Sequence, residues 1–390
     1  MKVLIAGAGI GGLTAALCLT KSGHEVCVFE QAKQLTEIGA GLQCGANALH
    51  VFDYLGLRSE IEKVSVAPER AEFKHYKSGE VLYSMRWGSD YLTKYGVPYL
   101  HIHRYDLQSI LAKALAQNSG INFNTKITGF TETETRVSLE LEDDRVVEGD
   151  ILIGADGIRS SVRQQLLGER TSKFTGNVAW RGVIPRDKLP ENFMHKIVSN
   201  FVGPKKHMVI YYLRKQKLVN FVGVVENKTW QDDSWVVKSP WEELQKDFTG
   251  WHPTVETIVN AVDKDQCYRW ALYNHKPFTN WSSKRVTLLG DAAHATLPFM
   301  ASGAAMAIED ARILERSLSE SKDVEQALQL YQNNRLARTA KIQKMSTQAG
   351  KLYHISNQQL LKIAFTGLNL MGGRREAFLA EYNANSIKLV

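Results

Sequence analysis

The sequence predicts an α/β fold in which helices cover a parallel sheet, a separate β-rich region forms a second domain, and the chain closes with helices. Three observations lead to this prediction. An apolar strand at the start runs into a glycine-rich turn, two later apolar strands also end in glycine, and a strand-rich segment separates those two. Parallel strands that return to one sheet bring such ends to a common edge, where ligands bind.

The first element is a strand from Val3 to Ala6, which is followed by Gly7, Gly9 and Gly12. In a GxGxxG turn the first glycine allows the tight turn, the second lets a pyrophosphate approach the backbone, and the third lets the helix pack closely on its strand. The N-terminus of that helix directs backbone N–H groups at the phosphates. We therefore predict a dinucleotide site, with a ligand-free glycine turn as the alternative.

The second strand, Glu25 to Phe29, ends on Glu30. A carboxylate about 20 residues past the glycines is placed to accept hydrogen bonds from the hydroxyls of an adenosine ribose. These residues leave open whether the dinucleotide is NAD or FAD.

The next segments are a glycine loop, a hairpin and a helix. The loop Gly39-Ala40-Gly41 is expected to bring the backbone close to a ligand a second time. Residues Glu69 to Met85 alternate in polarity and predict a hairpin outside the nucleotide unit. Arg104 lies in the first turn of a helix expected to run to about Gln117 and could reach a phosphate, although residue type alone favours a solvated arginine.

A meander and a second returning strand come next. Three strands, Asn122 to Thr128, Arg136 to Leu141 and Arg145 to Val147, are expected to cover one face of the nucleotide fold. The chain then returns with an apolar strand from Asp150 to Gly154. This strand places Asp156 at the carboxyl edge of the sheet.

The third returning strand, Arg285 to Leu289, leads to Asp291. A helix follows whose first residues, Gly303, Ala304 and Ala305, are small. Backbone N–H groups at such a helix start can face an oxygen or a developing negative charge.

Residues 177–226 predict a set of strands that form one large sheet and a separate substrate domain. Alternation places His207 and Tyr211 on one face of a strand, and Met208 and Tyr212 on the other. A His-Tyr pair on a sheet can also be an ordinary part of the core. Residues 323–351 predict a long amphipathic helix, and the tail from residue 357 predicts helices that pack on the outside.

Composition describes a globular chain. It has 390 residues, 44% of them hydrophobic, and 48 Lys and Arg against 41 Asp and Glu, for a net charge of +7. Because the basic residues are scattered, we expect an anionic substrate or cofactor and not a nucleic acid. We expect no membrane span, signal peptide or metal site, and four reduced cysteines, which together indicate a cytoplasmic protein.

Three motifs in this order resemble the single-component FAD-dependent aromatic hydroxylases, the group A flavoprotein monooxygenases, over nearly the whole chain. They are the glycines with Glu30, GADGIRSSVR from Gly154 to Arg163, and GDAAHATLPFMASGAAMAIEDA from Gly290 to Ala311. Within this family, VAWRGVIP, GPKKHMVIYY and WHPTVETIV are similar to salicylate hydroxylase, 3-hydroxybenzoate 6-hydroxylase and 6-hydroxynicotinate 3-monooxygenase. Gln43, however, stands where the hydroxynicotinate enzyme has histidine.

The resemblance implies a Rossmann-like FAD-binding fold of the glutathione-reductase type. It implies that the first glycines and Glu30 hold the ADP half of FAD, that Asp156 lies near the pyrophosphate, that Asp291 contacts the ribityl chain, and that Arg104 lies beside the flavin. The expected cofactor-binding residues are Gly7, Gly9, Gly12, Glu30, Gly41, Arg104, Asp156, Asp291, Pro298, Gly303, Ala304 and Ala305. The expected domains are an FAD-binding domain of residues 1–70, 100–175 and 283–350, a β-rich substrate domain of residues 71–99 and 176–282, and a C-terminal helical segment of residues 351–390.

The resemblance also implies a reaction. NAD(P)H reduces FAD, O2 reacts with the reduced flavin, and a flavin C4a-hydroperoxide hydroxylates a phenolic or hydroxypyridine carboxylate. His207 and Tyr211 match family positions at the substrate phenol, so His207, or Tyr211 through it, is the expected base. The alternatives are a flavin-dependent epoxidase or oxygenase of a non-aromatic or larger antibiotic-like substrate, and a non-catalytic dinucleotide-binding regulator. We expect a monomer or a homodimer.

Overall fold

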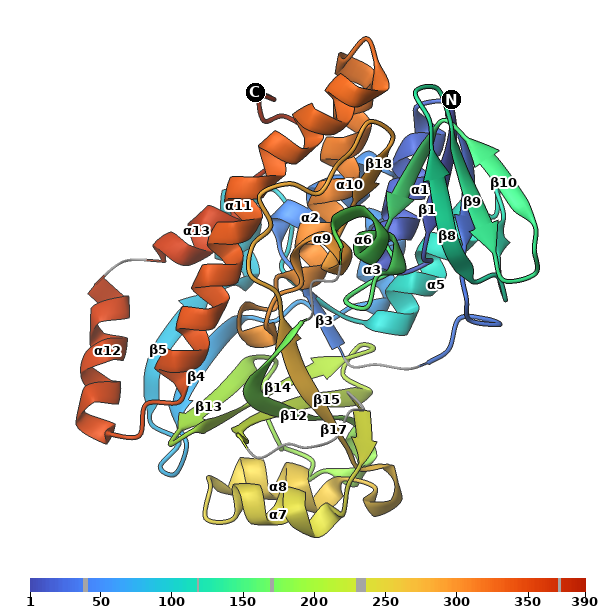
Figure 1. Ribbon diagram of the computed structural model, residues 1–390. Coiled ribbons are helices and arrows are strands. Elements are labelled where there is room, and N and C mark those ends of the chain that lie inside the picture. The colour runs from blue at the N-terminus through green and yellow to red at the C-terminus, as the bar shows by residue number, and fades with distance from the viewer. Residues whose placement is uncertain (38–40, 118, 169–171, 229–235, 371–372) are drawn as a thin grey trace.

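The computed structural model describes residues 1–37, 41–117, 119–168, 172–228, 236–370 and 373–390. Two sheets dominate the molecule (Figure 1). A parallel sheet with its helices forms the upper part, and a larger, mostly antiparallel sheet lies below it, with two short helices beneath. The long helix α11 runs alongside both parts. Gly39 and Ala40 of the predicted glycine loop lie outside the described residues.

The parallel sheet contains the three predicted returning strands. Its order is β18-β11-β1-β2-β7, and all its neighbours are parallel. The strands are β1 (Lys2–Ala6), β2 (Glu25–Phe29), β7 (Ile121–Asn122), β11 (Ile151–Gly154) and β18 (Val286–Leu288). The helices α1 (Ile10–Lys21), α5 (Arg104–Leu115) and α10 (Gly303–Glu320) pack with it, and α1 contacts both of the others. The predicted α/β class and the helix with Arg104 in its first turn are confirmed.

The predicted meander is correct for its last two strands but not for its first. The sheet β10-β9-β8 consists of β8 (Ile127–Glu132), β9 (Val137–Leu141) and β10 (Val146–Gly149). Residues 123–126, which were expected to be part of the first strand, form no strand. Asn124 has a positive φ of 51°, a conformation that ends an extended segment, and the two residues before Phe123 pair instead with β2.

The larger sheet has the order β16-β17-β12-β15-β14-β13-β4-β5. Its strands are β4 (Arg70–His75), β5 (Val81–Arg86), β12 (Lys173–Pro185), β13 (Val198–Gly203), β14 (Lys206–Leu213), β15 (Leu218–Glu226), β16 (Val236–Lys238) and β17 (Tyr268–Asn274). The predicted hairpin, β4 and β5, therefore joins the strands of residues 173–274. We propose the domain boundaries given above on the strength of this pairing.

The remaining elements connect and cover the two sheets. They are β3 (Gly41–Cys44), α2 (Ala46–Tyr54), α3 (Arg58–Val64), α4 (Gly88–Tyr95), β6 (Leu100–His103), α6 (Ser161–Leu167), α7 (Trp241–Phe248), α8 (Pro253–Ala261), α9 (Asp291–His294), α11 (Val324–Tyr353), α12 (Gln358–Leu370), α13 (Arg374–Ala380) and the short 3-10 helices η1 (Arg186–Lys188), η2 (Lys264–Gln266) and η3 (Pro298–Met300). The long predicted helix is confirmed as α11. Asp323 caps it, because its Oδ1 accepts from the N–H of Gln326 at 2.9 Å.

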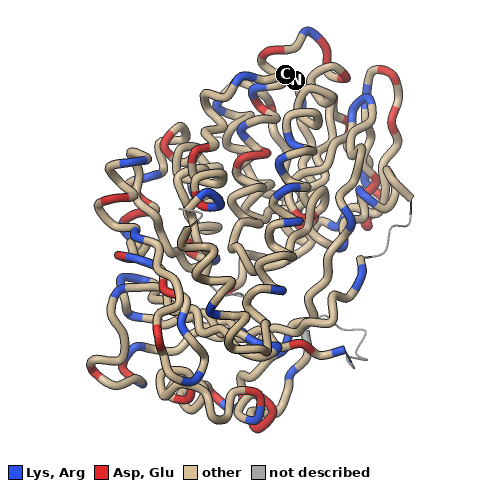
Figure 2. Tube along the Cα trace, turned by 90° about the vertical axis from the view of Figure 1, so that its left-hand side faces the viewer, with Lys and Arg blue, Asp and Glu red and all other residues tan. Residues whose placement is uncertain are grey.

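Lysines, arginines and acidic residues are scattered over the whole trace (Figure 2). None of the helices in the described ranges is both long and apolar enough to cross a bilayer.

Candidate active site

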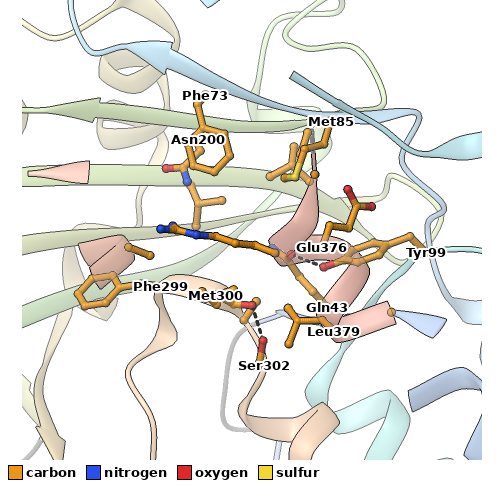
Figure 3. Close-up of a pocket in the computed structure, with 18 of the residues that line it drawn as sticks. Gln43, Phe73, Met85, Tyr99, Asn200, Phe299, Met300, Ser302, Glu376 and Leu379 are labelled. Carbon is orange, nitrogen blue, oxygen red and sulfur yellow. Dashed lines mark hydrogen bonds between the residues drawn. The ribbon is translucent and has the colours of Figure 1, made fainter. Parts of the chain in front are cut away.

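A cavity of about 210 Å³ lies between the larger sheet, the loop after α9 and the C-terminal helices (Figure 3). Its walls are mainly apolar and aromatic. The labelled side chains in Figure 3 come from the sheet (Phe73, Met85, Asn200), from the loop that contains η3 (Phe299, Met300, Ser302), from β3 and the segment before β6 (Gln43, Tyr99), and from α13 (Glu376, Leu379). Segments from all along the sequence thus enclose one compartment.

Stacked aromatic rings form one wall of this cavity. The rings of Trp87 and Tyr99 stack with centroids 3.8 Å apart and an interplanar angle of 15°. The indole N–H of Trp87 donates to Glu376 at 2.7 Å, and the hydroxyl of Tyr99 donates to Gln43 at 2.9 Å. Because both polar atoms have partners, neither of these two lining side chains has an unsatisfied donor.

His207 on β14 lines the cavity and is 4% exposed. Burial, together with the ring of His354, lowers the pKa of His207 well below its ordinary value. The imidazole is therefore neutral at pH 7, and one of its ring nitrogens carries a lone pair. Val209 lines the cavity as well, while Met208 packs in a different apolar cluster on the other face, so the predicted alternation along this strand is confirmed.

Tyr211 lies on the same face as His207 but deeper. It is not among the residues that line the cavity, and its ring lies 4.5 Å from the ring of His101, between centroids. A Cβ atom on Gly41 would come within 2.8 Å of the Tyr211 hydroxyl oxygen, so the glycine allows this close approach. Burial raises the pKa of the Tyr211 hydroxyl, which is therefore protonated at pH 7.

The glycine turn after β1 has the geometry that its sequence predicts. Gly7 has a φ of +100°, and a Cβ on Gly12 would lie 2.1 Å from the carbonyl oxygen of Gly7. The position that a Cβ on Gly9 would take has no neighbour within 4 Å. Helix α1 begins at this open space without a side-chain cap or an acidic residue in its first turn. Its first N–H groups are thus placed to bind an anion.

Acidic residues follow three strands at the same edge of the parallel sheet. Glu30 follows β2, and its two carboxylate oxygens accept from the N–H groups of Ala8 at 2.9 Å and Ala32 at 2.8 Å. Asp156 follows β11; its Oδ2 accepts from the N–H of Val162 at 3.2 Å, while its Oδ1 is buried without a hydrogen-bond partner in the described part of the chain. A buried, unpaired carboxylate oxygen needs a partner, which a bound ligand can supply.

The third acidic residue is Asp291, which follows β18 and begins α9. The residue is exposed and lies next to the start of α10. A Cβ on Gly303 would lie 3.9 Å from Asp291 Oδ1. Helix α10 has no side-chain cap and no acidic residue in its first turn, so the N–H groups of its small first residues are available to a negative charge.

A model of the family described as "FAD binding domain" matches residues 1–346. The chain belongs to this family. As a member of the FAD-binding-domain family it binds FAD, the cofactor that the resemblance predicted where the glycine turn alone left NAD and FAD open. The predicted Rossmann-like fold is confirmed as well.

Relatives of this FAD-binding-domain protein are hydroxylases. It is 36% identical to 3-hydroxybenzoate 6-hydroxylase of Polaromonas naphthalenivorans (strain CJ2) over 365 residues, which are 93% of this chain and 90% of the relative. It is 33% identical to 6-hydroxynicotinate 3-monooxygenase of Bordetella bronchiseptica over 349 residues, 88% of this chain and 90% of the relative. HpxO of Klebsiella pneumoniae, solved with FAD and uric acid, matches with a TM-score of 0.87 at 26% identity and 97% coverage of both chains. The protein is an FAD-dependent monooxygenase, as its motifs predicted.

The sheet edge fits FAD on its own geometry. The open space at Gly9 admits a pyrophosphate, the unpaired Oδ1 of Asp156 lies at the same edge, and Glu30 has lone pairs left for ribose hydroxyls. Arg104 is the first residue of α5, directly after β6. Pro298 and Ala305 line the cavity, which puts the start of α10 at the boundary of the cavity. The individual cofactor contacts stay predictions.

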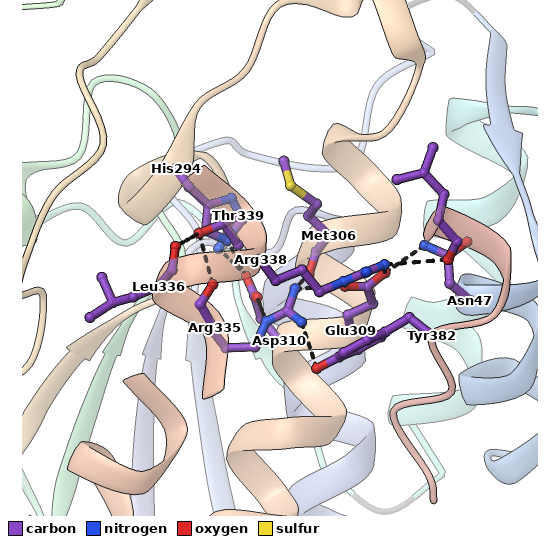
Figure 4. A network of polar contacts seen from close by, with 12 residues as sticks. Asn47, His294, Met306, Glu309, Asp310, Arg335, Leu336, Arg338, Thr339 and Tyr382 are labelled. Carbon is purple, nitrogen blue, oxygen red and sulfur yellow. Dashed lines mark hydrogen bonds and ion pairs between the residues drawn. The ribbon is translucent and has the colours of Figure 1, made fainter. Parts of the chain in front are cut away.

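A buried ionic network holds the start of α10 in place (Figure 4). Glu309 on α10 accepts from Arg335 Nη2 at 2.7 Å and from Arg338 Nε and Nη2, each at 2.7 Å. Asn47 on α2 donates to Glu309 at 2.6 Å. Because the two arginines lie three residues apart on α11, they share one helix face and reach the same carboxylate.

The neighbouring carboxylate of Asp310 holds the loop after β18. Its Oδ2 accepts from the N–H of Gly290 at 3.0 Å and lies 2.5 Å from His294 Nε2, while its Oδ1 accepts from Arg335 Nε at 2.7 Å. Contacts of Asp310 with Gly290 and His294 therefore fix the backbone on both sides of Asp291.

The tail after residue 357 forms helices, as predicted, but one of them also reaches the cavity. Helix α13 contributes Arg375, Glu376 and Leu379 to the cavity wall. The sequence argument missed these residues because α13 is short and its apolar spacing resembles that of any surface helix. The charged triplet Arg374-Arg375-Glu376 is equally typical of a solvated helix start, so the sequence offered no signal for this role.

Proposed function

We propose that this monooxygenase hydroxylates a phenolic or hydroxypyridine carboxylate, with NADH or NADPH as the reductant and O2 as the oxidant. The observation that carries the proposal is the cavity: a neutral histidine lines it, aromatic rings form its walls, and arginines of α13 reach it. Its volume of about 210 Å³ exceeds the ~150 Å³ of a cavity that takes up benzene. A single substituted ring therefore fits.

The cofactor carries the oxygen chemistry, since bound FAD supplies both electron transfer and oxygen activation. The chain supplies the remaining functions. His207 accepts the proton of the substrate hydroxyl, which makes the ring more nucleophilic. The apolar walls keep water away from the reacting ring. The uncapped start of α10 presents its positive end toward the boundary between cofactor and cavity, where it stabilises negative charge.

The carboxylate of the substrate pairs with Arg375. This arginine is half-buried and lines the cavity. Its positive charge acts against the rise that burial causes in the pKa of Tyr83 and of Tyr353, two other lining residues. Its neighbour Arg374 also reaches the cavity but is exposed. An arginine can hold a carboxylate with two parallel hydrogen bonds and so fix the orientation of the ring.

The names of the relatives support this substrate class, because 3-hydroxybenzoate and 6-hydroxynicotinate are both aromatic carboxylates that carry a hydroxyl group. The alternative, a non-aromatic or larger antibiotic-like substrate, is not favoured by a cavity of this size. A cytoplasmic location is part of the proposal, since the cysteines are free thiols. A monomer or homodimer is proposed as the oligomeric state.

The test is a substrate screen on the purified FAD-bound protein. Hydroxybenzoates and hydroxypyridine carboxylates are offered with NADH and with NADPH, and coenzyme oxidation, O2 uptake and product mass are recorded. We expect at least one member to stimulate coenzyme oxidation and to gain one oxygen atom. Matched compounds that lack either the hydroxyl or the carboxylate are the controls. Equal turnover of these controls, or no hydroxylated product from any member, overturns the proposal.

A further inference from the structure

Behind the cavity, His207 is the first member of a chain of three hydrogen-bonding side chains. Its Nδ1 lies 2.8 Å from Nε2 of His354, and Nδ1 of His354 lies 3.3 Å from Oε1 of Glu226. The three residues come from β14, from the C-terminal cap of α11 and from the end of β15. The fold thus brings together side chains that are up to 147 residues apart.

The chain runs from the cavity to the surface. His207 and His354 are 4% and 7% exposed, whereas the side chain of Glu226 is 33% exposed. The rings of Phe299 and Tyr353 lie 5.4 and 5.3 Å from the His207 ring, between centroids, and shield it from water. The hydrogen-bonded chain is therefore a polar path through an otherwise apolar wall.

Backbone contacts hold His354 in this position. The N–H of Lys205 donates to the carbonyl oxygen of His354 at 3.1 Å, and the N–H of Glu226 donates to the carbonyl oxygen of Lys205 at 3.0 Å. The turn before β14 thus ties the end of α11 to the strand that carries Glu226. The arrangement does not depend on the side chains alone.

The carboxylate at the outer end sets the tautomers of both histidines. A carboxylate only accepts hydrogen bonds, so the facing Nδ1 of His354 carries the proton and its Nε2 is an acceptor. His207 must then donate through Nδ1–H, which leaves its own Nε2 with a free lone pair. That nitrogen is the one that can accept a proton from a substrate hydroxyl.

The protonation states agree with this order. Burial is the main cause that lowers the pKa of both histidines, so both rings are neutral at pH 7. The charge of Glu226 partly offsets the lowering of the His354 pKa, and His354 adds to the lowering of the His207 pKa. Of the other neighbours, Phe299 on η3 does not titrate, and burial raises the pKa of Tyr353 on α11, so both stay uncharged.

We propose that His354 and Glu226 form a proton relay that orients His207 as a base and carries the substrate proton from the cavity to the surface. The substrate O–H bond breaks as its proton passes to Nε2 of His207. The Nδ1 proton of His207 passes to Nε2 of His354, and the Nδ1 proton of His354 passes to Glu226, which releases it to solvent. The O–H electron pair stays on the substrate, which becomes a phenolate, and the relay transfers protons without any oxidation or reduction.

The substrate named in this inference rests on the proposed function, but the tautomers of His207 and His354 do not depend on it. The test uses the FAD-bound protein as wild type and as His354→Gln, His354→Leu and Glu226→Gln. A glutamine at 354 can still accept a hydrogen bond from His207, but it cannot pass on a proton. Leucine can do neither. His195→Gln, at an exposed histidine remote from the relay, is the matched control.

The first measurement is made without substrate. Nitrogen-15 NMR of histidine-labelled protein reports which ring nitrogen of His207 carries the proton. We expect the Nδ1–H form in the wild type, in His354→Gln and in His195→Gln, and its loss in His354→Leu. An Nε2–H form of His207 in the wild type overturns the inference, whether or not any substrate is found.

The second measurement is hydroxylation at pH 7 of a phenolic carboxylate that the wild type turns over. We expect kcat to fall about tenfold or more in His354→Gln and His354→Leu, and to fall in Glu226→Gln, with KM changed less than about twofold, because general-base assistance contributes at least this much. An unchanged kcat in His354→Gln overturns the relay. If the wild type hydroxylates no phenol, the proposed function fails, and the tautomer of His207 still decides the relay.

Discussion

The Nε atom of Arg335 on α11 lies 2.7 Å from Oδ1 of Asp310 on α10, and neither side chain has any exposure to solvent. Two charges removed from water in this way are stable only as long as each keeps its partners. Since Asp310 also holds Gly290 and His294, this pair connects the stability of the helices to the geometry of the cofactor edge.

We expect Arg335→Leu to lower the free energy of unfolding by about 3–5 kcal/mol, because it leaves the buried carboxylates of Glu309 and Asp310 without a main partner. Urea unfolding of the FAD-free protein measures this loss. The matched control is Lys126→Met, which breaks the surface pair with Glu142 and should cost at most about 1 kcal/mol. Equal effects of the two changes would contradict a structural role of the network.

The stability should depend on pH through Asp310. Burial alone would raise the pKa of its carboxyl, but His294 and Arg335 outweigh burial and lower it to about 2, below the ~3.9 of an unfolded chain. A carboxyl group shifted downward adds stability that is complete above the unfolded pKa and is lost as the pH falls toward the folded pKa.

We therefore expect Asp310 to account for about 2–3 kcal/mol of the stability lost between pH 5 and pH 2. Urea unfolding of the wild type and of Asp310→Asn at several pH values measures it. The difference between the two proteins should shrink as the pH falls. A difference that is the same at every pH would show that Asp310 titrates normally.

Two glycines of the first turn should respond differently to alanine. Gly12→Ala places a Cβ 2.1 Å from the carbonyl oxygen of Gly7 and should lower the Tm of the FAD-free protein. Gly9→Ala meets no protein atom within 4 Å, so that Tm should not change. Its methyl group would instead enter the space of the pyrophosphate and weaken FAD binding by about 1–3 kcal/mol, the usual cost of overpacking.

The flavin-to-protein absorbance ratio and an FAD titration measure this effect. Gly120→Ala is the control, because its Cβ would also meet nothing within 4 Å and the residue lies away from the cofactor edge. If Gly9→Ala bound FAD with the affinity of the wild type, the pyrophosphate would not lie against Gly9.

Arg375→Met should raise KM for a carboxylate substrate about tenfold or more, as expected for the loss of a charged hydrogen bond worth about 1.5–3 kcal/mol. Steady-state kinetics with the best substrate of the screen measure the change. The carboxamide analogue is the control, because its KM should be nearly the same in wild type and variant. A carboxylate KM that stays at the wild-type value would remove Arg375 from substrate recognition.

The cofactor edge could be predicted because its residues are local in sequence. Gly7 to Gly12, Asp156 and Asp291 each follow directly from an apolar strand, and the rule that parallel strands share an edge brings them together. The face that His207 occupies was also predictable, because a strand alternates with a period of two residues.

The remaining features depend on contacts between distant segments. Nothing near His354 in the sequence indicates that it meets His207, and nothing near Arg375 indicates a cavity wall. The strand expected over residues 123–126 does not form because Asn124 turns the backbone. The N–H of Thr125 instead donates to the backbone carbonyl oxygen of Glu30, a tertiary contact that local propensity does not predict.

The order of the parallel sheet also has a consequence for biosynthesis. Strand β1 and its neighbour β2 both leave the ribosome well before the other neighbour of β1, strand β11, which begins at Ile151. At a usual rate of ~5–20 residues per second, the edge of Val3, Leu4 and Ile5 waits on the order of ten seconds for its partner. During that interval the nascent chain carries an uncovered apolar strand edge, to which chaperones can bind.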